Sequence, residues 1–380
     1  MKSILFFIES LDGGGAEGVL ENVVVSLDKT KFDLHVVSET DNEFRTQRVK
    51  ENSRHHSFIH KNLKGSKLRE IINKIIIKFS LIAPENMVRK LLIRGRYDIE
   101  VAFCEGYSTK IIGNSKKRKA KKIAWVHTDV LNNPWSESIF GGAENERKCY
   151  ENFDAIVCVS ETIRESFAKK YGMEEKLHVI YNLIDDKKTL NQAKEPLDFK
   201  ITKRPFWVLA GSFRKVKGYD RMVEVCAMLR DEGYDFSVVI MGIGYERNDI
   251  EVLLDKYNLR DKITLLDYQA NPHKFMANAD LFVCSSYAEG YSTVVSEAVL
   301  LGLPIVTTEC SGMREIFGDY RCGIICENSK EGLYNSLKEV LDNPELSEKF
   351  KAEEKIRAAA FSMENQIKYT ERFFEEICQK

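Results

Sequence analysis

The sequence predicts an α/β protein built from two doubly wound parallel-sheet domains. Two observations lead to this prediction: the length of 380 residues, and the regular alternation of short β-rich runs with longer helical patterns. A chain of this length is too large for one compact core and suits two domains. Strands joined by helical crossovers form parallel sheets with helices on both faces. Since such sheets bind ligands at the carboxyl ends of their strands, we expect a substrate in a cleft between two facing domains.

Each domain is predicted from one series of strand-like runs. The first series consists of Ile4–Ile8, Leu34–Ser38, Ile99–Phe103, Lys122–Val126 and Ala155–Val159. The second series consists of Trp207–Leu209, Ser237–Met241, Ile263–Leu266, Leu281–Cys284, Pro304–Thr307 and Gly323–Cys326. Helical patterns separate the runs, as the crossovers of parallel sheets require.

The polar stretch from Tyr181 to Pro205 separates the two series and predicts the domain boundary, because it lacks sustained periodicity. We expect a first domain at residues 1–185, a linker at 186–205 and a second domain at 206–361. The remaining segment, 362–380, has an amphipathic helical pattern from Met363 to Cys378. We expect this helix to pack back toward the first domain.

Composition and charge exclude several classes of protein. With 43% apolar and 30% charged residues, the chain is globular rather than disordered. Its 57 Lys and Arg against 58 Asp and Glu argue against a nucleic-acid binder. Nine scattered cysteines without zinc-site spacing predict reduced thiols and a cytosolic protein. No stretch approaches the roughly 20 apolar residues of a membrane-spanning helix.

The glycine-rich loop after the first predicted strand has three interpretations. GGGAEG at Gly13–Gly18 fits the dinucleotide pattern G-x-G-x-x-G, and Glu39 follows at the distance expected for a ribose-binding acid. Against a dinucleotide, the strand ends near Glu9, too far ahead of the glycines for the tight turn of that fold. The favoured alternative is that the Gly14–Gly15 backbone approaches an anionic ligand at the following helix. The third is a purely structural turn.

The second half carries the strongest signals for an anion site. Arg214, Lys215 and Lys217 cluster beyond a strand, a pattern that is also typical of a solvated charged loop. The segment EGYSTVVSE, Glu289–Glu297, follows a later strand and opens a helix. N–H groups at that helix start favour a phosphate. They belong to Tyr291, Ser292, Thr293 and Val294.

The two carboxylates of that segment would repel a phosphate, so they need another role. Carboxylates accept hydrogen bonds and grip hydroxyl groups well. Glu297, one turn into the helix, is placed to hold the hydroxyls of a ribose, and Glu289, ahead of the helix, to hold those of a sugar. Ribose, diphosphate and sugar follow one another in that order in a nucleotide-sugar.

At these residues the sequence resembles the large GT4 family of retaining glycosyltransferases, whose GT-B fold has two facing Rossmann-like domains. Glu289 and Glu297 match the family's E-x7-E signature. Five further features occur in the family's order: GGAE at Gly14–Glu17, WVHTD around His127, YNLID from Tyr181, KG at Lys217–Gly218 and ADLFVCSS from Ala279. One departure is Ser212, where the family usually has an arginine; Arg214 is close enough to substitute for it.

The resemblance implies roles for individual residues. It implies catalytic roles for Glu289, Lys217 and His127, with His127 in contact with the donor sugar. The implied donor-binding residues are Gly14, Gly15, Arg214, Lys217, Gly242, Tyr291, Ser292, Thr293, Val294 and Glu297. Glu105, in an EGYST stretch after a first-domain strand, is the predicted acceptor-binding residue. We expect no metal ion, since a lysine clamp replaces a DxD-type motif, and no cofactor. Transfer is expected to retain the anomeric configuration without a protein nucleophile.

Residues 61–96 contain ten Lys and Arg against two acidic residues, and they bear on the acceptor. An apolar helical stripe is flanked by Lys67, Lys74 and Lys78. It consists of Leu68, Ile71, Ile72, Ile75, Phe79 and Ile82. Two interpretations are open: a core-facing helix with solvated lysines, or an interfacial helix on anionic lipid. KKRKAKK at Lys116–Lys122 adds positive charge to the same half.

We expect transfer of a hexose or N-acetylhexosamine from a nucleotide-sugar, UDP-sugar favoured, to a lipid-linked or oligosaccharide acceptor. Family members that build surface polysaccharides commonly use lipid-linked acceptors, which implies a cytoplasmic protein on the inner face of the cell membrane. The expected partners are the donor, the acceptor and an anionic membrane surface, and not nucleic acid. The alternatives are another GT-B enzyme such as a phosphorylase or sugar-nucleotide epimerase, a non-catalytic nucleotide-sugar-binding protein, and a dinucleotide-dependent dehydrogenase.

Overall fold

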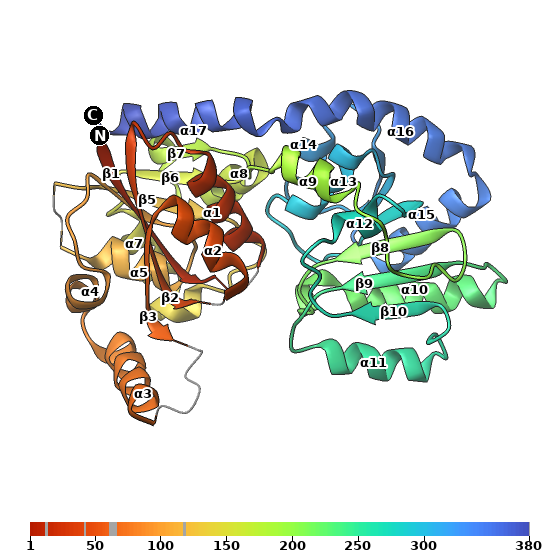
Figure 1. Cartoon of the computed structure of the whole chain (residues 1–380), viewed down its shortest axis with the longest axis horizontal. Coiled ribbons are helices and arrows are strands. Elements are labelled where there is room, and N and C mark those ends of the chain that lie inside the picture. The colour runs from red at the N-terminus through yellow and green to blue at the C-terminus, as the bar shows by residue number, and fades with distance from the viewer. Residues whose placement is uncertain (12–13, 42, 61–66, 117–118, 380) are drawn as a thin grey trace. The chain divides into compact units, whose positions relative to one another are not determined.

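The computed structural model describes residues 1–11, 14–41, 43–60, 67–116 and 119–379. It shows two compact α/β units (Figure 1). Unit 1 comprises Met1–Leu183 together with Glu364–Lys380, and unit 2 comprises Ile184–Met363. Part of the expected linker is therefore folded: α9 (Asp186–Gln192) is a helix of unit 2. Gly13 of the glycine loop, residues 61–66 of the basic segment and residues 117–118 of KKRKAKK lie outside the described residues.

Unit 1 contains a seven-stranded sheet in the order β3-β2-β1-β4-β5-β6-β7, with parallel pairing throughout the described registers. β1 lies inside the sheet, between β2 and β4, and its run Ile4–Phe7 is apolar at every position and has no exposed surface, as expected for a strand covered on both faces. The strands are β1 (Lys2–Ser10), β2 (Phe32–Asp41), β3 (Arg54–His60), β4 (Ile99–Ala102), β5 (Lys121–Val126), β6 (Ala155–Cys158) and β7 (Leu177–Val179). β3 and β7 were not among the predicted strands.

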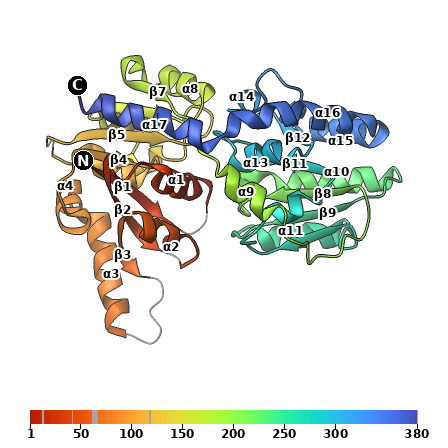
Figure 2. The ribbon, with the colours of Figure 1, turned by 45° about the horizontal axis from the view of Figure 1, so that its top comes forward.

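Most helices of unit 1 cover this sheet, whereas the helix Lys67–Ile82 extends beyond it near the strand Arg54–His60 (Figures 1 and 2). The helices of unit 1 are α1 (Gly15–Ser26), α2 (Glu43–Asn52), α3 (Lys67–Ile82), α4 (Glu85–Val88), the π-helical turn η1 (Arg89–Ile93), α5 (Tyr107–Asn114), α6 (Glu137–Phe140), α7 (Ala143–Tyr150), α8 (Glu161–Tyr171), the 3-10 turn η2 (Glu174–Lys176) and α17 (Met363–Ile377). α17 comes from the end of the chain and packs on unit 1: Phe374 meets the rings of Phe6 and Phe32 edge-on, at centroid distances of 6.0 and 6.2 Å.

Unit 2 contains a six-stranded sheet in the order β10-β9-β8-β11-β12-β13, again with parallel pairing in the described registers. The strands are β8 (Phe206–Ala210), β9 (Ser237–Met241), β10 (Ile263–Leu266), β11 (Leu281–Cys284), β12 (Ile305–Thr308) and β13 (Gly323–Cys326). In the core, the Trp207 ring stacks on Phe236 at a centroid distance of 4.7 Å. The predicted α/β class with two doubly wound sheets is therefore confirmed.

Helices and turns also surround the sheet of unit 2. They are α9, η3 (Lys215–Lys217), α10 (Tyr219–Asp231), α11 (Arg247–Lys256), α12 (His273–Met276), α13 (Thr293–Leu301), α14 (Met313–Phe317), α15 (Lys330–Asp342), α16 (Glu345–Arg357) and η4 (Ala358–Phe361). All nine cysteines are free thiols. In the described ranges, no helix combines the length and apolar character needed to cross a bilayer.

The apolar stripe of α3 does not face the core. Leu68, Ile71, Ile72, Ile75 and Ile82 are between 44% and 70% exposed. The helix rests on unit 1 by a different side, on which Ser80 is buried and accepts a hydrogen bond at its carbonyl from the Tyr107 hydroxyl, at 2.9 Å. The interpretation of α3 as a core-facing helix is therefore wrong.

Candidate functional site

Glycines bring the loops at the carboxyl edge of the unit 2 sheet into close contact. A Cβ atom on Gly242 would lie 1.8 Å from the Gly211 carbonyl oxygen, so only glycine lets the loops after β8 and β9 touch. Gly218 has φ +63°, and a Cβ there would lie 2.0 Å from the Ser285 carbonyl oxygen. This contact holds η3, and with it Lys217, against the loop after β11. Gly242 therefore shapes the edge through its backbone.

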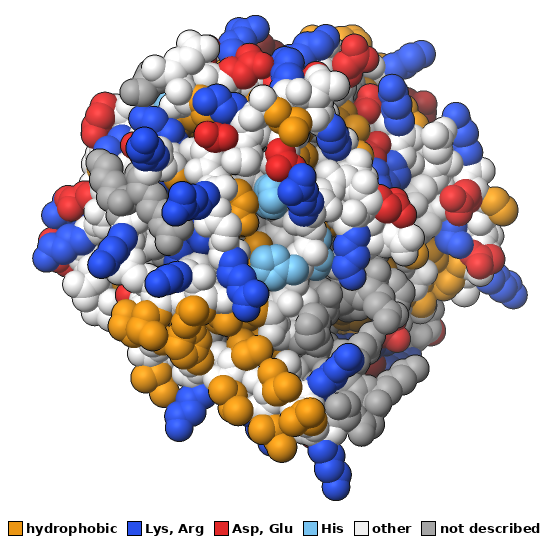
Figure 3. Space-filling model, turned by 60° about the vertical axis from the view of Figure 1, so that its left-hand side comes forward, with side chains coloured by type: hydrophobic (Ala, Val, Ile, Leu, Met, Phe, Trp, Pro, Cys, Tyr) orange, Lys and Arg blue, Asp and Glu red, His pale blue; other side chains and the backbone are white. Residues whose placement is uncertain are grey.

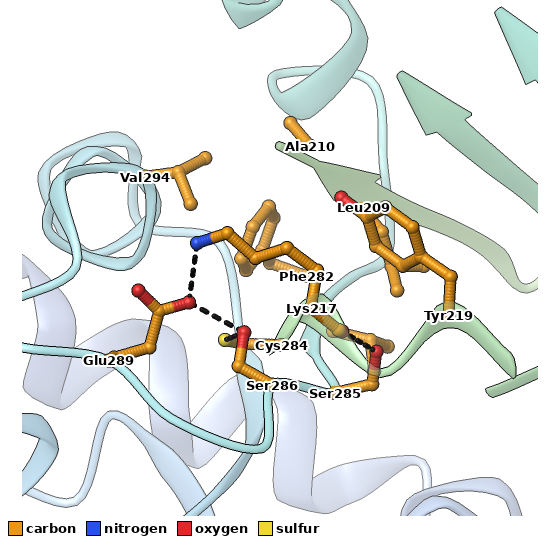
Figure 4. Close-up of a pocket in the computed structure, with 11 residues that line it drawn as sticks. Leu209, Ala210, Lys217, Tyr219, Phe282, Cys284, Ser285, Ser286, Glu289 and Val294 are labelled. Carbon is orange, nitrogen blue, oxygen red and sulfur yellow. Dashed lines mark hydrogen bonds and ion pairs between the residues drawn. The ribbon is translucent and has the colours of Figure 1, made fainter. Parts of the chain in front are cut away.

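Lys217 and Glu289 form an ion pair at this edge (Figure 4). Lys217 Nζ lies 2.7 Å from Glu289 Oε1, and the Ser286 hydroxyl donates to the same oxygen at 2.5 Å. Both charged side chains are largely shielded, with exposed fractions of 22% and 10%. Burial alone would lower the pKa of Lys217, but the Glu289 carboxylate raises it above its ordinary value. The lysine is thus a fixed cation that an incoming anion would have to draw away from Glu289.

Arg214 lies beside this pair along the chain, at the start of η3. Its side chain is exposed, and no hydrogen bond or ion pair of that side chain occurs within the described ranges. Ser212 contributes its carbonyl to the Arg214 N–H at 2.8 Å. Arg214 is therefore a cation without a competing partner near the site, as its expected substitution for an arginine at position 212 requires.

Helix α13 begins at the same edge. Ser292 is its N-cap residue in an extended conformation, and its side chain makes no capping hydrogen bond. Ser292 and Tyr291 are both 5% exposed, while Thr293 and Val294 are half-buried and start the helix. Val294 and Lys217 line one small pocket together with Glu289 (Figure 4). The positive end of a helix dipole and a lysine thus converge on one point.

Glu297 lies one turn into α13 and faces a buried histidine. His273 Nδ1 lies 2.9 Å from Gln192 Oε1 of α9. Its other ring nitrogen, Nε2, lies 3.2 Å from Glu297 Oε2, an ion-pair distance without hydrogen-bond geometry. The Glu297 side chain keeps 23% of its surface exposed. Gln192 and His273 thus fix one side of the carboxylate and leave its remaining lone pairs for a ligand.

At the carboxyl edge of unit 1, Glu105 holds the turn that carries His127. Glu105 Oε1 accepts hydrogen bonds from the His127 and Thr128 N–H groups at 2.7 and 2.6 Å and from the Thr128 hydroxyl at 2.8 Å. Glu105 is 1% exposed, and burial raises its pKa to about 7. These contacts tie Glu105 to the His127 turn, and its role in acceptor binding stays a prediction.

His127 itself is a neutral imidazole. Burial lowers its pKa to about 4, against a smaller opposing effect of a hydrogen bond to the Phe103 backbone. The Nε2 atom is buried and has no hydrogen-bond partner among the described residues. Because the ring's single N–H is used by the Phe103 carbonyl, the unpaired Nε2 can accept a hydrogen bond from a sugar hydroxyl, but the neutral ring offers no charge to a phosphate.

Further carboxylates surround this edge. Glu9, at the end of β1, accepts from the Tyr107 and Ser108 N–H groups at 2.7 and 3.2 Å and so caps α5. Burial raises the pKa of Glu9, and burial together with the Glu9 charge raises that of Glu39 to about 7. Gly14 is the N-cap of α1 and Gly15 its first residue. A Cβ on Gly14 would lie 2.2 Å from Glu17 Oε2, so a carboxylate stands next to the backbone predicted to receive an anion.

Sequence reasoning missed the partners of the predicted residues. Ser286 and His273 were not predicted, although they contact Glu289 and Glu297. Ser286 lies three residues before Glu289, so its hydroxyl was the one local signal available. His273 lies 24 residues before Glu297 on another helix, and no sequence spacing indicates that contact.

Two doubly wound parallel sheets, with a lysine, a helix start and two glutamates at one carboxyl edge, define a GT-B glycosyltransferase. The chain belongs to the GT4 family: residues 13–188 match the model described as Glycosyltransferase Family 4, and residues 191–357 match that of Glycosyl transferases group 1. The resemblance seen in the sequence motifs is thereby confirmed.

Several curated relatives and solved structures are similar to the chain. A Campylobacter jejuni N-acetylgalactosamine-N,N'-diacetylbacillosaminyl-diphospho-undecaprenol 4-alpha-N-acetylgalactosaminyltransferase is 26% identical over 95% of this chain and 96% of its own. N-acetyl-alpha-D-glucosaminyl L-malate synthase of Bacillus anthracis is 24% identical over 67% and 66%. Anabaena HepE, solved with UDP-glucose, superposes with a TM-score of 0.73 at 16% identity over 97% and 99%. WaaG, a glycosyltransferase involved in lipopolysaccharide biosynthesis, has a TM-score of 0.66 at 17% identity over the same fractions.

Proposed function

We propose that the protein is a retaining, metal-independent glycosyltransferase of surface polysaccharide synthesis. It moves a hexose or N-acetylhexosamine from a UDP-sugar to a lipid-linked glycan acceptor. The observation that carries this proposal is the convergence of Lys217, the start of α13 and Glu289 at one edge of unit 2. A cation and a helix dipole suit a diphosphate, and the carboxylate beside them suits the attached sugar.

The chemistry requires negative charge to be held as it grows on the departing diphosphate. Lys217, Arg214 and the N–H groups from Ser292 to Val294 supply donors at the edge of unit 2, and the Gly14–Gly15 backbone is assigned the same task in unit 1. Fixed donors stabilise such charge without reorganising during the reaction. With a lysine in this role, no metal ion is needed.

Glu289 is assigned to the positive charge that develops on the transferred sugar. Positive charge develops on the sugar as it becomes oxocarbenium-like, and a carboxylate near the ring stabilises it. Ser286 keeps Glu289 in place when the diphosphate draws Lys217 away. His127, neutral and with Nε2 unpaired, is assigned to a hydroxyl of the same sugar. Glu297 holds the ribose, and attack from the leaving-group face retains the configuration.

Relatives and neighbours support the choice of donor and acceptor. HepE was solved with UDP and with UDP-glucose, and TarM of S. aureus with UDP. The acceptor in the name of the Campylobacter jejuni relative is linked to diphospho-undecaprenol, and a Rhizobium meliloti relative is a lipopolysaccharide core biosynthesis glycosyltransferase. For a lipid-linked acceptor, the proposed location of this protein is the cytoplasmic face of the cell membrane, as a peripheral protein.

Thermal unfolding with saturating ligand tests the donor class, because a ligand that binds the native state raises the melting temperature by mass action. UDP should raise it by several degrees, GDP less, and NADH not at all. A panel of UDP-sugars, each incubated with the protein and an undecaprenyl-diphosphate-linked glycan, should then yield one elongated product with retained configuration. Stabilisation by NADH alone would indicate a dehydrogenase, and UDP binding without transfer or hydrolysis of any sugar would indicate a non-catalytic binding protein.

A further inference from the structure

Helix α3 and the turn that follows it carry a large exposed apolar surface, called here the α3 surface (Figure 3). Its side chains are between 39% and 74% exposed. They are Leu68, Ile71, Ile72, Ile75, Ile77, Leu81 and Ile82 of α3, with Met87 of α4 and Leu91 of η1. Contiguous apolar patches of this kind are rare on monomeric soluble proteins and mark a surface that is covered in use.

No part of the chain that the structure describes covers this surface. α3 touches unit 1 chiefly through its other side, around Ser80, and Ile76 and Phe79 are the apolar residues of the helix that are partly shielded. Leaving seven Ile and Leu side chains of a 16-residue helix in water forgoes the favourable transfer that normally stabilises a helix. A surface of this kind calls for an external partner.

The charge around the α3 surface indicates which partner. Seven exposed cations lie between residues 67 and 96, against two acidic residues, Glu70 and Glu85. The cations are Lys67, Arg69, Lys74, Lys78, Lys90, Arg94 and Arg96. Figure 3 shows Lys and Arg side chains bordering the apolar cluster. A second copy of the chain would bring the same positive border against this one, so self-association on this surface is disfavoured.

We propose that the α3 surface docks on an anionic lipid bilayer, with the apolar side chains in the headgroup region and the cations on lipid phosphates. An amphipathic helix with a basic border binds membranes in this way, by burying its apolar face and by attraction to anionic lipid. The inference deepens the proposed function and rests on it in one respect: a lipid-linked acceptor is reached from the membrane surface.

Sedimentation with vesicles tests the docking. The intact protein should sediment with phosphatidylcholine vesicles that contain phosphatidylglycerol, much less with phosphatidylcholine alone, and less again at high salt. Reversing three charges, Lys67→Glu, Lys74→Glu and Lys78→Glu, should weaken partitioning about 100-fold or more, since each cation near the membrane contributes several-fold. The matched control reverses three exposed lysines of unit 2, Lys200, Lys349 and Lys355, and should change binding little.

The apolar side chains need a separate variant. Leu68→Ser, Ile75→Ser and Ile82→Ser together should remove binding even at low salt, whereas Val252→Ser with Ile356→Ser, equally exposed in unit 2, should not. All five positions are more than half exposed, so the fold should survive and circular dichroism should be unchanged. Vesicle binding equal to that of the intact protein in both α3 variants would overturn the proposal. So would a dimer in light scattering that the α3 variants convert to a monomer.

Hydrolysis of the soluble UDP-sugar separates this inference from the proposed function. It should be the same in the α3 variants and the intact protein, because α3 holds none of the assigned site residues. Vesicle binding without donor hydrolysis by the intact protein would keep the docking surface and reject the transferase. Donor hydrolysis without vesicle binding would keep the transferase and reject the docking surface.

A second inference concerns Glu105. We infer that Glu105 is a positioning residue for His127, because its buried Oε1 accepts three hydrogen bonds from the His127–Thr128 turn. A buried carboxylate that accepts several N–H bonds fixes the turn that carries the imidazole, as an oriented supporting residue does in other sites. This inference also rests on the proposed function.

A double-mutant cycle tests this role with donor hydrolysis as the readout. His127→Ala and Glu105→Ala should each lower kcat about 10-fold or more, and the double variant should be no worse than His127→Ala alone, because Glu105 acts through His127. Glu105→Gln keeps the acceptor oxygen and should restore most of the activity. Effects that multiply, or a change confined to the KM of the acceptor, would overturn the positioning role. Loss of UDP binding in Glu105→Ala would also overturn it, since His127 does not hold the nucleotide.

Discussion

The carboxyl edges of the two sheets share a topology and differ in chemistry. The unit 2 order, β10-β9-β8-β11-β12-β13, repeats that of the first six strands of unit 1, β3-β2-β1-β4-β5-β6. Yet the edge of unit 2 carries, beside Glu289 and Glu297, a lysine, an exposed arginine and the start of a helix. The edge of unit 1 carries Glu9, Glu39, Glu105 and a neutral histidine.

This difference shows that topology locates a site while loop residues decide what it binds. The edge of unit 2 suits an anionic diphosphate. Apart from the Gly14–Gly15 backbone, the edge of unit 1 has carboxylates and a neutral ring, which suit hydroxyl groups. The net charge of the two halves of the chain is opposite to what these edges suggest. The first 180 residues are the basic half, with 30 Lys and Arg against 25 Asp and Glu. Those cations lie instead in places such as α3.

The largest expected effect comes from the cation of unit 2. Lys217→Ala should lower turnover about 100-fold or more, the usual loss when one preorganised donor to a developing anion is removed. Lys215→Ala is the matched control, because Lys215 is 63% exposed and pairs with Asp220 outside the pocket. Steady-state transfer at saturating donor measures both. If the turnover of Lys217→Ala stays within a few-fold of that of the intact protein, Lys217 does not make the carboxyl edge of unit 2 an anion site, and the proposed difference between the two edges is wrong.

Glu354, on α16, tests whether a raised pKa alone marks a site. It is fully buried, neither carboxylate oxygen has a hydrogen-bond partner among the described residues, and burial raises its pKa to about 9. We expect Glu354→Met to stabilise the fold by about 1–3 kcal/mol, the cost of an unsatisfied buried polar group, and to leave activity unchanged. Urea denaturation measures this, with the exposed Glu348→Met as control. A loss of activity would make Glu354 part of the machinery.

The raised pKa of Glu354 also predicts how the stability of the fold changes with pH. Because the folded-state pKa lies above the unfolded value of about 4.5, the fold holds a proton that the unfolded chain releases. Stability should therefore fall as pH rises from about 4.5 to about 9, and Glu354→Met should reduce that fall.

A smaller pH effect is expected at the edge of unit 1. Burial and the Glu9 charge raise the pKa of Glu39 to about 7, so the folded state favours its protonated form and loses stability as pH rises from about 4.5 to about 7. Glu39→Gln should therefore raise the melting temperature more at about pH 8 than at about pH 5. Glu51→Gln, an exposed change in the same unit, should shift both equally. An equal shift for Glu39→Gln would mean that this edge does not hold its carboxylates in a shielded environment.

The sequence predicted the central strands because they are continuous apolar runs, as buried parallel strands are. It missed β3, whose RHHSFIH sequence is polar at its start, and β7, which has three residues. It left the orientation of α3 open, because an apolar stripe has the same periodicity whether it faces a core or a membrane. Only the exposure of Ile75 and its neighbours distinguishes the two.

For the site, local spacing was sufficient where the residues share one helix start, as Ser292 and Glu297 do. It could not show that Lys217 meets Glu289 across 72 residues, or that Gln192, His273 and Glu297 form a chain of contacts. Glu105 was singled out from its position after a strand, but its burial and its bonds to the His127 turn are tertiary features.

Calorimetric titration of UDP into Glu289→Gln and Glu297→Gln tests most directly whether the edge of unit 2 holds the donor as assigned. Glu297→Gln should weaken binding of the bare nucleotide about 10-fold, because a carboxylate to the ribose is lost. Glu289→Gln should leave it unchanged or tighten it, because Lys217 is then free for the diphosphate, while turnover falls. Equal weakening of UDP binding in both variants would contradict the assignment.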